Sequence, residues 1–465
     1  MLSRWSQPCF WALKSMLALG LVLGVLALTF DLTKETSRSS TEATELNLTR
    51  WLYGTQDEES RILLPTNDVI KQGFPFFRGR KFKIWNNDLH SSPVQDLKHF
   101  LNPFGVEVIH YALDARCKRY FNGQCRGADE IKVINQSSVM DMDDQVITDF
   151  YQAYKDDAEM KSIDAFVCFH PAAVCELFLT FNRSLFVIAS TRYAAARPEE
   201  MRWHTWNWRL ARIARSPRNL VAANNRYDVE YMKFYAGIEP ELLPSFCGYT
   251  NAVYHPTSNS SFLLYAGRYP TTKHNAYFES EWTEACKIEN CTGFSVCHFF
   301  GAFEGGHSFE EEASFRGVIH IPYQVSTMSF FEQYRMGIPL FAPSLDLLAS
   351  LDQQFDFVNE RNCKDLRKCY HDDDIASIPR HPSAAHLPDP HNKTDSAAIR
   401  YWLKFADFYQ WPHVIHFDSI ADLIRKMKST NYEDVSRKMR TYNERVETLL
   451  LLKWKRILTR VSLHR

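Results

Sequence analysis

The sequence predicts an α/β protein built from two domains, residues 61–250 and 251–440, which face each other across a cleft. Two observations lead to this fold class. Short apolar runs typical of buried strands alternate with segments of helical spacing, as in a parallel sheet covered by helices. The alternation pauses at residues 240–257, where three prolines and a glycine interrupt any long element, and then resumes. The length of 465 residues accommodates two large domains and short end segments.

Each element of the first domain follows from its local pattern. Strands are expected in short apolar or alternating runs at 81–85, 106–111, 163–169, 185–190 and 220–223. Helices are predicted between and after them at 94–101, 171–181, 198–214 and 226–235. Gly237 stands just beyond the last of these, at the position where a left-handed residue ends a helix.

The second domain repeats the pattern with fewer recognisable elements. Strands are expected at 262–266, 318–322 and within 337–342, with a short helix at 330–336. Residues 441–465 are apolar and then basic, which predicts a final helix packing across both domains; membrane contact is the alternative. Ligands of such sheets bind outside the carboxyl ends of the strands, so a site is expected in the cleft.

The first sixty residues predict a membrane anchor and a stem. Residues 10–30 form an apolar run, broken by Lys14, that is long enough to cross a bilayer. Basic residues precede the run and Asp31 follows it, so the positive-inside rule places residues 1–9 in the cytosol and the remainder in the lumen. Residues 31–60 have the composition of a flexible stem. A cleaved signal peptide is the alternative.

Cysteines and glycosylation motifs agree with a lumenal location. Local disulfides are the favoured interpretation of Cys117/Cys125, Cys168/Cys175, Cys363/Cys369 and the group Cys286, Cys291 and Cys297. A metal site is the weaker interpretation, because no Cys-x2-Cys pair occurs. Asn-x-Ser/Thr motifs expected to carry glycans are found at Asn47, Asn135, Asn182, Asn259 and Asn392.

Composition excludes two broad classes of protein. The formal net charge is −1 and no basic stripe precedes the C-terminal segment, which argues against a nucleic-acid partner. Hydrophobic residues make up 45% of the chain and aromatic residues 14%, so the bulk of the chain can bury a core and is not disordered.

Three segments resemble those of a glycosyltransferase of the GT-B type, in which two Rossmann-like domains face each other across a nucleotide-sugar cleft. Residues 220–247 are similar to the end of the acceptor domain, and residues 262–273 to the first strand and loop of the donor domain. Residues 321–344 resemble the donor signature, which is a strand, a loop, a Glu-containing helix and Gly-x-Pro. The resemblance covers residues 75–450 and implies that the second domain binds the nucleotide sugar.

The resemblance assigns the donor-binding residues as Gly267, Arg268, Lys273, Ser326, Thr327 and Glu332. The Glu332 carboxylate can accept hydrogen bonds from both ribose hydroxyls, and the start of its helix suits phosphate. Arg268 and Lys273 would neutralise the leaving diphosphate without a metal. The alternatives are a first-turn Glu favoured by the helix dipole and a surface turn at Arg268.

Candidate catalytic residues come from loops after strands of the first domain. Many retaining enzymes of this type have a second Glu eight positions before the ribose Glu, where this chain has Gln324, so an inverting mechanism is slightly favoured. An inverting reaction needs a base near the acceptor hydroxyl. The candidates are His170, Asp88, His90 and Glu176, with Arg192 as an acceptor contact. Turn and cap chemistry at Asp88 and His90, and a salt bridge at Arg192, are the alternatives.

Two further patterns have simpler interpretations. The acidic run at 141–144 could hold Mn²⁺ in a different glycosyltransferase fold, but the polar residues before it favour a solvated loop. Trp203 and Trp206 share one face of a predicted helix, where packing is favoured over stacking on sugars.

Together these observations predict a Golgi type II membrane enzyme whose lumenal part transfers a sugar from a nucleotide sugar to a glycan or glycoprotein. No metal and no bound cofactor are expected, since the nucleotide sugar is a cosubstrate. A catalytically silent, glycan-binding or accessory protein of the secretory pathway is the alternative.

Overall fold

The computed structural model describes residues 9–10, 66–71, 81–114, 126–197, 199–257, 260–266, 273–303, 306–358 and 379–464. The predicted tail, anchor and stem therefore lie outside the described residues, except for the two-residue strand β1 (Cys9–Phe10), which pairs antiparallel with β9. Within the described ranges, no helix combines the length and apolar character that a membrane span requires.

The first domain is built on a six-stranded, all-parallel sheet in the order β3-β2-β4-β5-β6-β7. Its strands are β2 (Phe82–Asp88), β3 (Val106–Ala112), β4 (Ala165–Cys168), β5 (Ser184–Ala189), β6 (Leu220–Ala223) and β7 (Glu241–Leu242). The central strands β4, β5 and β6 are buried along their whole length, which explains their continuous apolar sequences. The five strands expected from the sequence are all present, and β7 is additional.

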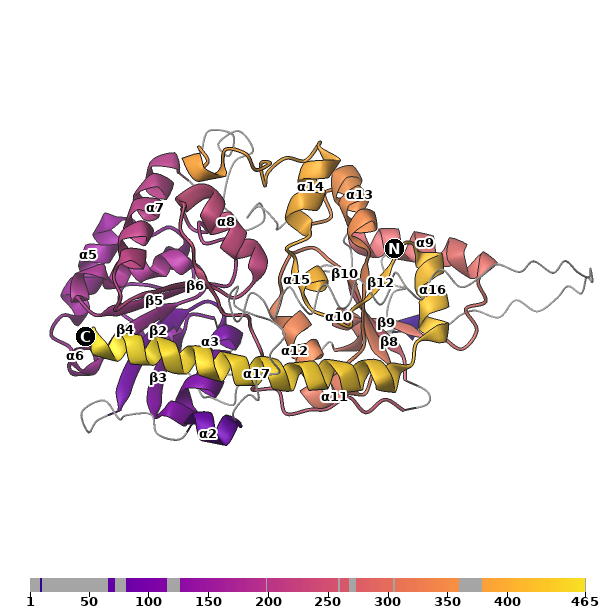
Figure 1. Cartoon of the computed structure of the whole chain (residues 1–465), viewed down its shortest axis with the longest axis horizontal. Helices are drawn as coiled ribbons and strands as arrows, with labels where there is room; N and C mark the ends of the chain where they lie inside the picture. Colours follow the sequence, from indigo (N-terminus) through magenta and orange to yellow (C-terminus); the bar gives the residue numbers. More distant parts are fainter. Residues whose placement is uncertain are drawn as a thin grey trace, which may run out of the picture.

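Helices cover both faces of this sheet (Figure 1). They are α2 (Asn67–Lys71), α3 (Ser91–Leu101), α5 (Asp144–Tyr154), α6 (Ala158–Ser162), α7 (Glu200–Arg215) and α8 (Arg226–Ala236). Short 3₁₀ segments are η1 (Asn102–Phe104), η2 (Ala128–Glu130) and η3 (Ser138–Met140). Gly237 follows α8 with a φ of 63°, as expected of a C-terminal cap. The expected α-helix at 171–181 is instead the 3₁₀ segment η4 (Ala172–Phe181).

The second domain contains a sheet in the order β1-β9-β8-β10-β11-β12, parallel except for β1. Its strands are β8 (Phe262–Ala266), β9 (Val296–His298), β10 (Gly317–Ile321), β11 (Leu340–Pro343) and β12 (Ile415–Phe417). Its helices are α9 (Lys273–Ile288), α10 (Phe299–Ala302), α11 (Phe309–Ala313), α12 (Met328–Met336), α13 (Leu345–Phe355), η7 (Pro382–Ala384), α14 (Ser396–Leu403), α15 (Asp407–Gln410) and α16 (Ile420–Ser429).

A single long helix, α17 (Tyr432–Leu463), runs across both domains (Figure 1). In its first half, the Asn443 side chain donates a hydrogen bond to the Tyr334 carbonyl of the second domain at 3.0 Å. In its second half, Lys453 Nζ donates to the Leu242 carbonyl of the first domain at 2.8 Å. The helix expected at 441–465 is therefore the C-terminal part of a longer helix that begins at Tyr432.

Two expected disulfides and several packing interpretations can be checked directly. Cys168–Cys175 and Cys286–Cys291 are bonded, as expected of closely spaced cysteines, and Cys247 is a buried free thiol. The pairs Cys117/Cys125 and Cys363/Cys369 lie outside the described residues. Trp203 and Trp206 are buried, so the packing interpretation is confirmed. Asp143 caps α5 by accepting a hydrogen bond from the Val146 backbone at 2.8 Å, in keeping with a solvated acidic loop.

Candidate functional site

A cavity of about 640 Å³ lies between the two domains. Its wall in the first domain comes from segments that directly follow β2, β4, β5 and β6. Its wall in the second domain comes from β8, from the segments after β9 and β10, and from the start of α12. The carboxyl ends of both parallel sheets therefore open onto one cavity, which is where sheets of this kind bind ligands.

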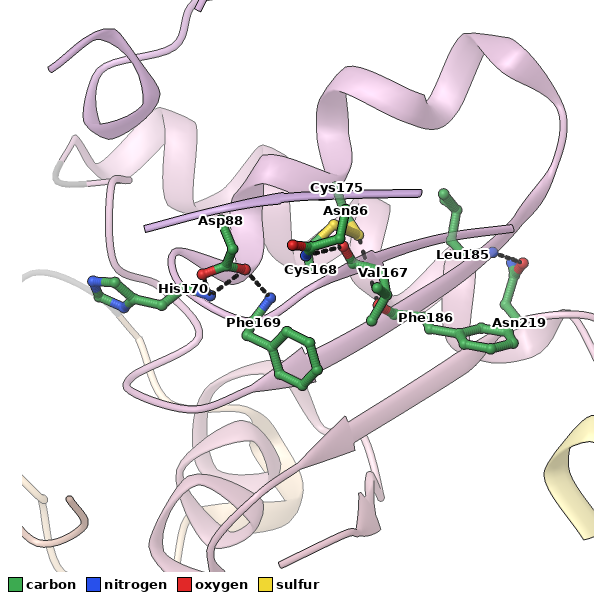
Figure 2. The surroundings of a disulfide bond; sticks show 10 residues. All are labelled: Asn86, Asp88, Val167, Cys168, Phe169, His170, Cys175, Leu185, Phe186 and Asn219. Carbon is green, nitrogen blue, oxygen red and sulfur yellow. Dashed lines mark hydrogen bonds between the residues drawn. A yellow bond between two sulfur atoms is a disulfide. The ribbon is translucent and has the colours of Figure 1, made fainter. Parts of the chain in front are cut away.

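The Asp88 carboxylate ties together the ends of β2 and β4. It accepts hydrogen bonds from the backbone N–H groups of Phe169 at 2.8 Å and His170 at 3.1 Å (Figure 2). It also accepts one from the backbone N–H group of His90 at 3.0 Å. Burial raises the pKa of Asp88 to about 7, although these bonds act in the opposite direction. Asp88 is fully buried and does not line the cavity, and its carboxylate holds the backbone at the ends of β2 and β4. The catalytic role predicted for Asp88 remains a prediction.

His170 and His90 line the cavity as a stacked pair of imidazoles. Their ring centroids are 4.3 Å apart and the planes differ by 9°. His170 Nδ1 lies 2.5 Å from the Thr191 hydroxyl, which follows β5. Figure 2 shows the His170 ring extending away from the Asp88 carboxylate. Burial lowers the pKa of His170 well below its ordinary value, helped by the charges of His90 and Arg192, so its imidazole is neutral at neutral pH.

Glu176 and Arg192 are engaged in buried ion pairs. Glu176 accepts hydrogen bonds from Arg197 Nε and from Arg209 Nη1, each at 2.6 Å. Arg192 makes a two-point contact with Asp228, at 2.6 and 2.9 Å. Neither residue lines the cavity, and the salt bridge given as the alternative for Arg192 is present. The catalytic and acceptor roles predicted for the two residues remain predictions.

The start of α12 forms the floor of the cavity in the second domain. Thr327 is the N-cap, and its hydroxyl accepts a hydrogen bond from the Phe330 backbone at 3.3 Å. Ser329 shares a hydrogen bond of 3.1 Å with the Tyr265 hydroxyl at the end of β8. The line of residues from Ser326 to Ser329 faces the cavity, so unpaired N–H groups of the first helical turn are presented to it.

Glu332 joins three parts of the chain at the cavity. Its carboxylate, on α12, accepts a hydrogen bond from the Tyr249 hydroxyl of the interdomain connector. It also accepts a hydrogen bond from Ser92 at the start of α3. Burial raises the pKa of Glu332 to about 7, and the neighbouring charge of Glu312 acts in the same direction. A ligand hydroxyl entering here would replace Tyr249 or Ser92 as a donor.

A second carboxylate in the cavity is paired with an imidazole. His307 Nε2 lies 3.2 Å from Glu312 Oε2, and the other oxygen of Glu312 accepts a hydrogen bond of 2.8 Å from Gln333. Gln333 in turn contacts His320 Nε2 at 2.7 Å. Burial alone would lower the pKa of His307, but the hydrogen bond and charge of Glu312 outweigh it and raise the pKa.

Several residues of the site were not anticipated from the sequence. They include Ser92, Thr191, Tyr249, His307 and Glu312, together with the aromatic residues Tyr265, Phe299, Phe300, Phe309 and Tyr323. Thr191 could have been found, because it directly follows an expected strand on the same edge as His170. The aromatic residues lie on segments without periodic patterns, so only the folded chain brings them together.

The remaining predicted donor residues are Gly267, Arg268 and Lys273. Gly267 and Arg268 are not among the described residues. Lys273 begins α9, where its ammonium donates to the Asp356 carbonyl, and it does not line the cavity. Among the described residues, no three His, Cys, Asp or Glu side chains are grouped so as to hold a metal ion.

The glycosylation motifs fall on the surface where they can be assessed. Asn135 and Asn182 are exposed and Asn392 is partly exposed. Asn47 and Asn259 lie outside the described residues.

The fold and the cavity define a two-domain α/β protein with a cavity at the carboxyl ends of the parallel strands of both sheets. No protein-family model matches the chain, and no curated protein sequence matches it. Among solved structures, the glycosyltransferase SnogD from Streptomyces nogalater is similar at 9% identity and a TM-score of 0.41, covering 82% of this chain and 100% of its own.

Two other solved structures are similar to this chain at comparably low sequence identity. CalG4, the calicheamicin glycosyltransferase, is 11% identical with a TM-score of 0.35, covering 79% of this chain and 95% of its own. Arabidopsis thaliana UGT89C1, complexed with UDP-L-rhamnose, is 10% identical with a TM-score of 0.35, covering 81% and 93%. Similarity at this level assigns neither a family nor an activity to the chain. The description of the fold is therefore based on the order and direction of the strands alone.

Proposed function

We propose that the chain is a glycosyltransferase that moves a sugar from a nucleotide sugar to a hydroxyl of a glycan or glycoprotein. The observation that carries this proposal is the single cavity at the carboxyl ends of both sheets, with a helix N-terminus and Glu332 on one wall and paired imidazoles on the other. Such a cavity can hold a phosphorylated donor and a hydroxyl acceptor face to face.

The donor would bind to the second domain. Its phosphates suit the unpaired N–H groups and hydroxyls at the start of α12, and its ribose hydroxyls suit Glu332. Tyr265, Phe299 and Tyr323 surround this region and offer rings for stacking on the base or the sugar. Arg268 stays a predicted contact to the diphosphate.

The acceptor would lie against the first domain, where His170 is the base. Neutral His170 accepts the proton of the acceptor hydroxyl, whose oxygen attacks the anomeric carbon as the bond from that carbon to the phosphate oxygen breaks. The bonding electron pair leaves with the diphosphate. Attack from the face opposite the leaving group inverts the anomeric configuration. Protein groups alone stabilise the leaving group in this proposal, without a metal.

The activity test uses the part of the chain from residue 61 onward, purified and assayed with a panel of nucleotide sugars. Donor hydrolysis or transfer to a mixed glycan acceptor supports the proposal, and added chelator is expected to leave the rate unchanged. Failure of every nucleotide sugar to bind, measured by calorimetry, would contradict it. Nucleotide binding with no turnover, and an unchanged cellular activity in Glu332→Ala, would favour the silent protein instead.

The location is a second part of the proposal: a Golgi enzyme anchored by residues 10–30 with its catalytic part in the lumen. In the membrane-inserted chain the pairing of β1 with β9 is then absent, because Phe10 begins the anchor. The basic flank before the apolar run, and exposed sequons at Asn135 and Asn182, support it. We expect endoglycosidase treatment of the cell-expressed chain to reduce its mass, and Asn182→Gln to remove one glycan of that shift. A chain that carries no glycan and is alkylated at Cys286 without reduction would contradict the lumenal location.

A further inference from the structure

The proposed function leaves one electrostatic need unmet by the described part of the cavity. A nucleotide sugar carries two negative charges on its diphosphate, and the cavity wall also contains the acidic side chains of Asp114, Glu310, Glu312 and Glu332. In the described wall no lysine or arginine is present, and the groups able to carry positive charge are His90, His170 and His307. A diphosphate next to four acidic side chains requires a fixed cation, because charge in a partly dry cavity is poorly screened.

His307 is held rigidly in the wall of the second domain. Its ring stacks on Phe303 at 4.5 Å between centroids, with planes 30° apart, and meets the edge of Phe299 at 5.1 Å. Phe299 packs in turn on Tyr265, which bonds Ser329 at the start of α12. Contacts therefore connect His307 to the predicted phosphate position through two aromatic rings.

The two nitrogens of His307 have different surroundings. Nε2 is directed to Glu312, 3.2 Å away. Within the described residues, Nδ1 has no hydrogen-bond partner. It is also not one of the fully buried atoms without a partner, so it is accessible from the cavity. Since His307 lines the cavity, Nδ1 is the nitrogen that a ligand can reach.

The carboxylate behind His307 is itself fixed. Glu312 is 1% exposed, and Gln333 and His320 extend the chain of hydrogen bonds into the core of the second domain. A buried carboxylate that holds an imidazole from behind keeps the ring oriented and stabilises its protonated form.

We propose that the His307–Glu312 pair is the diphosphate contact of the donor site, in which protonated His307 donates from Nδ1 to a phosphate oxygen and Glu312 holds the proton on Nε2. This inference rests on the proposed function, since it names the residue that meets the charge of the leaving group. It adds a specific cation on the loop before α11, where sequence patterns indicate no phosphate site.

The charged groups around His307 set the sign of its pH dependence. Glu312 and Glu311 face it from α11 and Glu332 from α12, and all three favour its protonated form. The α10 side contributes the aromatic residues Phe299 and Phe303. Donor affinity should therefore fall as pH rises and His307 loses its proton. Glu332 would act in the opposite sense, because ionisation at higher pH makes it a better acceptor for ribose hydroxyls.

The experiment measures the affinity of the nucleotide sugar that binds the wild-type protein best, by calorimetry between pH 5.5 and 8.5. Both phosphates of this probe are esterified, so neither titrates in that range. We expect affinity to fall about tenfold across it in the wild type, the size of one charge-assisted hydrogen bond. In His307→Gln the fall should disappear and the affinity at pH 6 should drop about tenfold. The matching free nucleoside has no phosphate for His307 to contact, so its affinity should not fall with rising pH in either protein.

Two further variants separate this role from a structural one. Glu312→Gln should shift the fall in affinity to lower pH without abolishing it, because His307 remains but its proton is less stabilised. His204→Gln, at an exposed imidazole beside Glu200 on α7, makes the same substitution away from the cavity and should change nothing. Thermal unfolding of each variant checks that it is folded.

The outcomes distinguish the inference from the function on which it depends. Failure of the wild type to bind any nucleotide sugar overturns the proposed function. A wild-type affinity for the nucleotide sugar that changes with pH just as the affinity for the free nucleoside does, or a fall with rising pH that persists in His307→Gln, overturns the role of His307 and leaves the proposed function standing.

Discussion

Burial gives different surroundings to three side chains near the cavity that the sequence predicts as candidate bases. Asp88, His90 and His170 were grouped as candidate bases, yet the Asp88 carboxylate is used by backbone N–H groups and only the two histidines reach the cavity. The result is an imidazole with a lowered pKa beside Thr191 at one wall and an imidazole with a raised pKa beside Glu312 at the other. A base and a leaving-group contact require pKa shifts in these opposite directions.

The first prediction concerns His170 as the base. Replacing it with Gln removes the proton acceptor but keeps a polar side chain, so kcat should fall about 100-fold or more while KM for the donor changes little. Because the pKa of His170 is lowered, the wild-type rate should persist below the pH at which an ordinary histidine protonates. Thr191→Val should lower kcat less, and Thr191→Ser should restore it. A His170→Gln enzyme with wild-type kcat would contradict the assignment.

The second prediction concerns Glu332, whose burial should cost stability. Its pKa is about 7 in the folded protein and near 4.5 when exposed, so the folded state binds the proton more tightly. Its contribution to stability is therefore complete below pH 4.5 and is lost as pH rises toward 7. Glu332→Gln should raise the free energy of unfolding at pH 7.5 by about 1–2 kcal/mol, allowing for solvent in the cavity. Urea unfolding at pH 5 and 7.5 measures it.

The exposed Glu281→Gln on α9 is the control and should leave stability unchanged at both pH values. The same Glu332→Gln variant should bind the donor less well, since a carboxylate that accepts from two hydroxyls is lost. A variant less stable than the wild type at pH 7.5 would show that the contacts to Tyr249 and Ser92 outweigh the cost of burying the charge.

At the scale of elements, local patterns were sufficient where strand and helix signals were strong. β6 and β8 have the predicted bounds, and α8 and α12 end at glycines in the left-handed conformation. The sequence pattern of 171–181 predicts an α-helix, but the segment is a 3₁₀ helix. Its Cys175 is bonded to Cys168 at the end of β4. Periodicity cannot report such a constraint, because it depends on a partner outside the segment.

Some residues of the candidate site could likewise be predicted from local sequence patterns, and others could not. Thr327 and His170 could be predicted because one precedes a helix and the other follows a strand, and Glu332 could be predicted from the resemblance to the donor signature. Tyr249 and His307 belong to irregular segments, and their function depends on contacts with distant residues, so no local pattern indicates them.

The third prediction tests how closely α12 approaches α17. Gly337 has a φ of 78°, and a Cβ there would lie 2.9 Å from Ser436 Oγ and 3.0 Å from Arg440 Cγ. Gly337→Ala should cost about 2–4 kcal/mol, the sum of a left-handed alanine and an overpacked contact. Gly293, with a φ of 89° and open space around it, gives the matched control. Gly293→Ala should cost about 1 kcal/mol, and equal losses in the two variants would contradict the close approach.

At the scale of the whole molecule, α17 connects the two domains as one structural unit. Tyr442 packs on Trp411 and Tyr334 of the second domain, with ring centroids 5.8 and 6.4 Å apart. Trp454, 4% exposed, lies between Lys453 and Lys455, which bond the Leu242 and Ile70 carbonyls of the first domain. A helix buried against both domains fixes the distance between the two cavity walls, and so between the base and the donor site.

This coupling gives the last prediction. Trp454→Ala removes a large buried side chain from the half of α17 that packs on the first domain and should lower the free energy of unfolding by about 3–5 kcal/mol. Because α17 joins the domains, the loss should appear in one cooperative transition that fluorescence and circular dichroism follow together, and Tyr442→Ala should lower the same transition. Trp208→Ala, at a 59% exposed tryptophan on α7, is the control and should change stability by less than about 0.5 kcal/mol. Two separate transitions in Trp454→Ala, one of them with the wild-type midpoint, would mean that the domains unfold independently and that α17 does not set the geometry of the cavity.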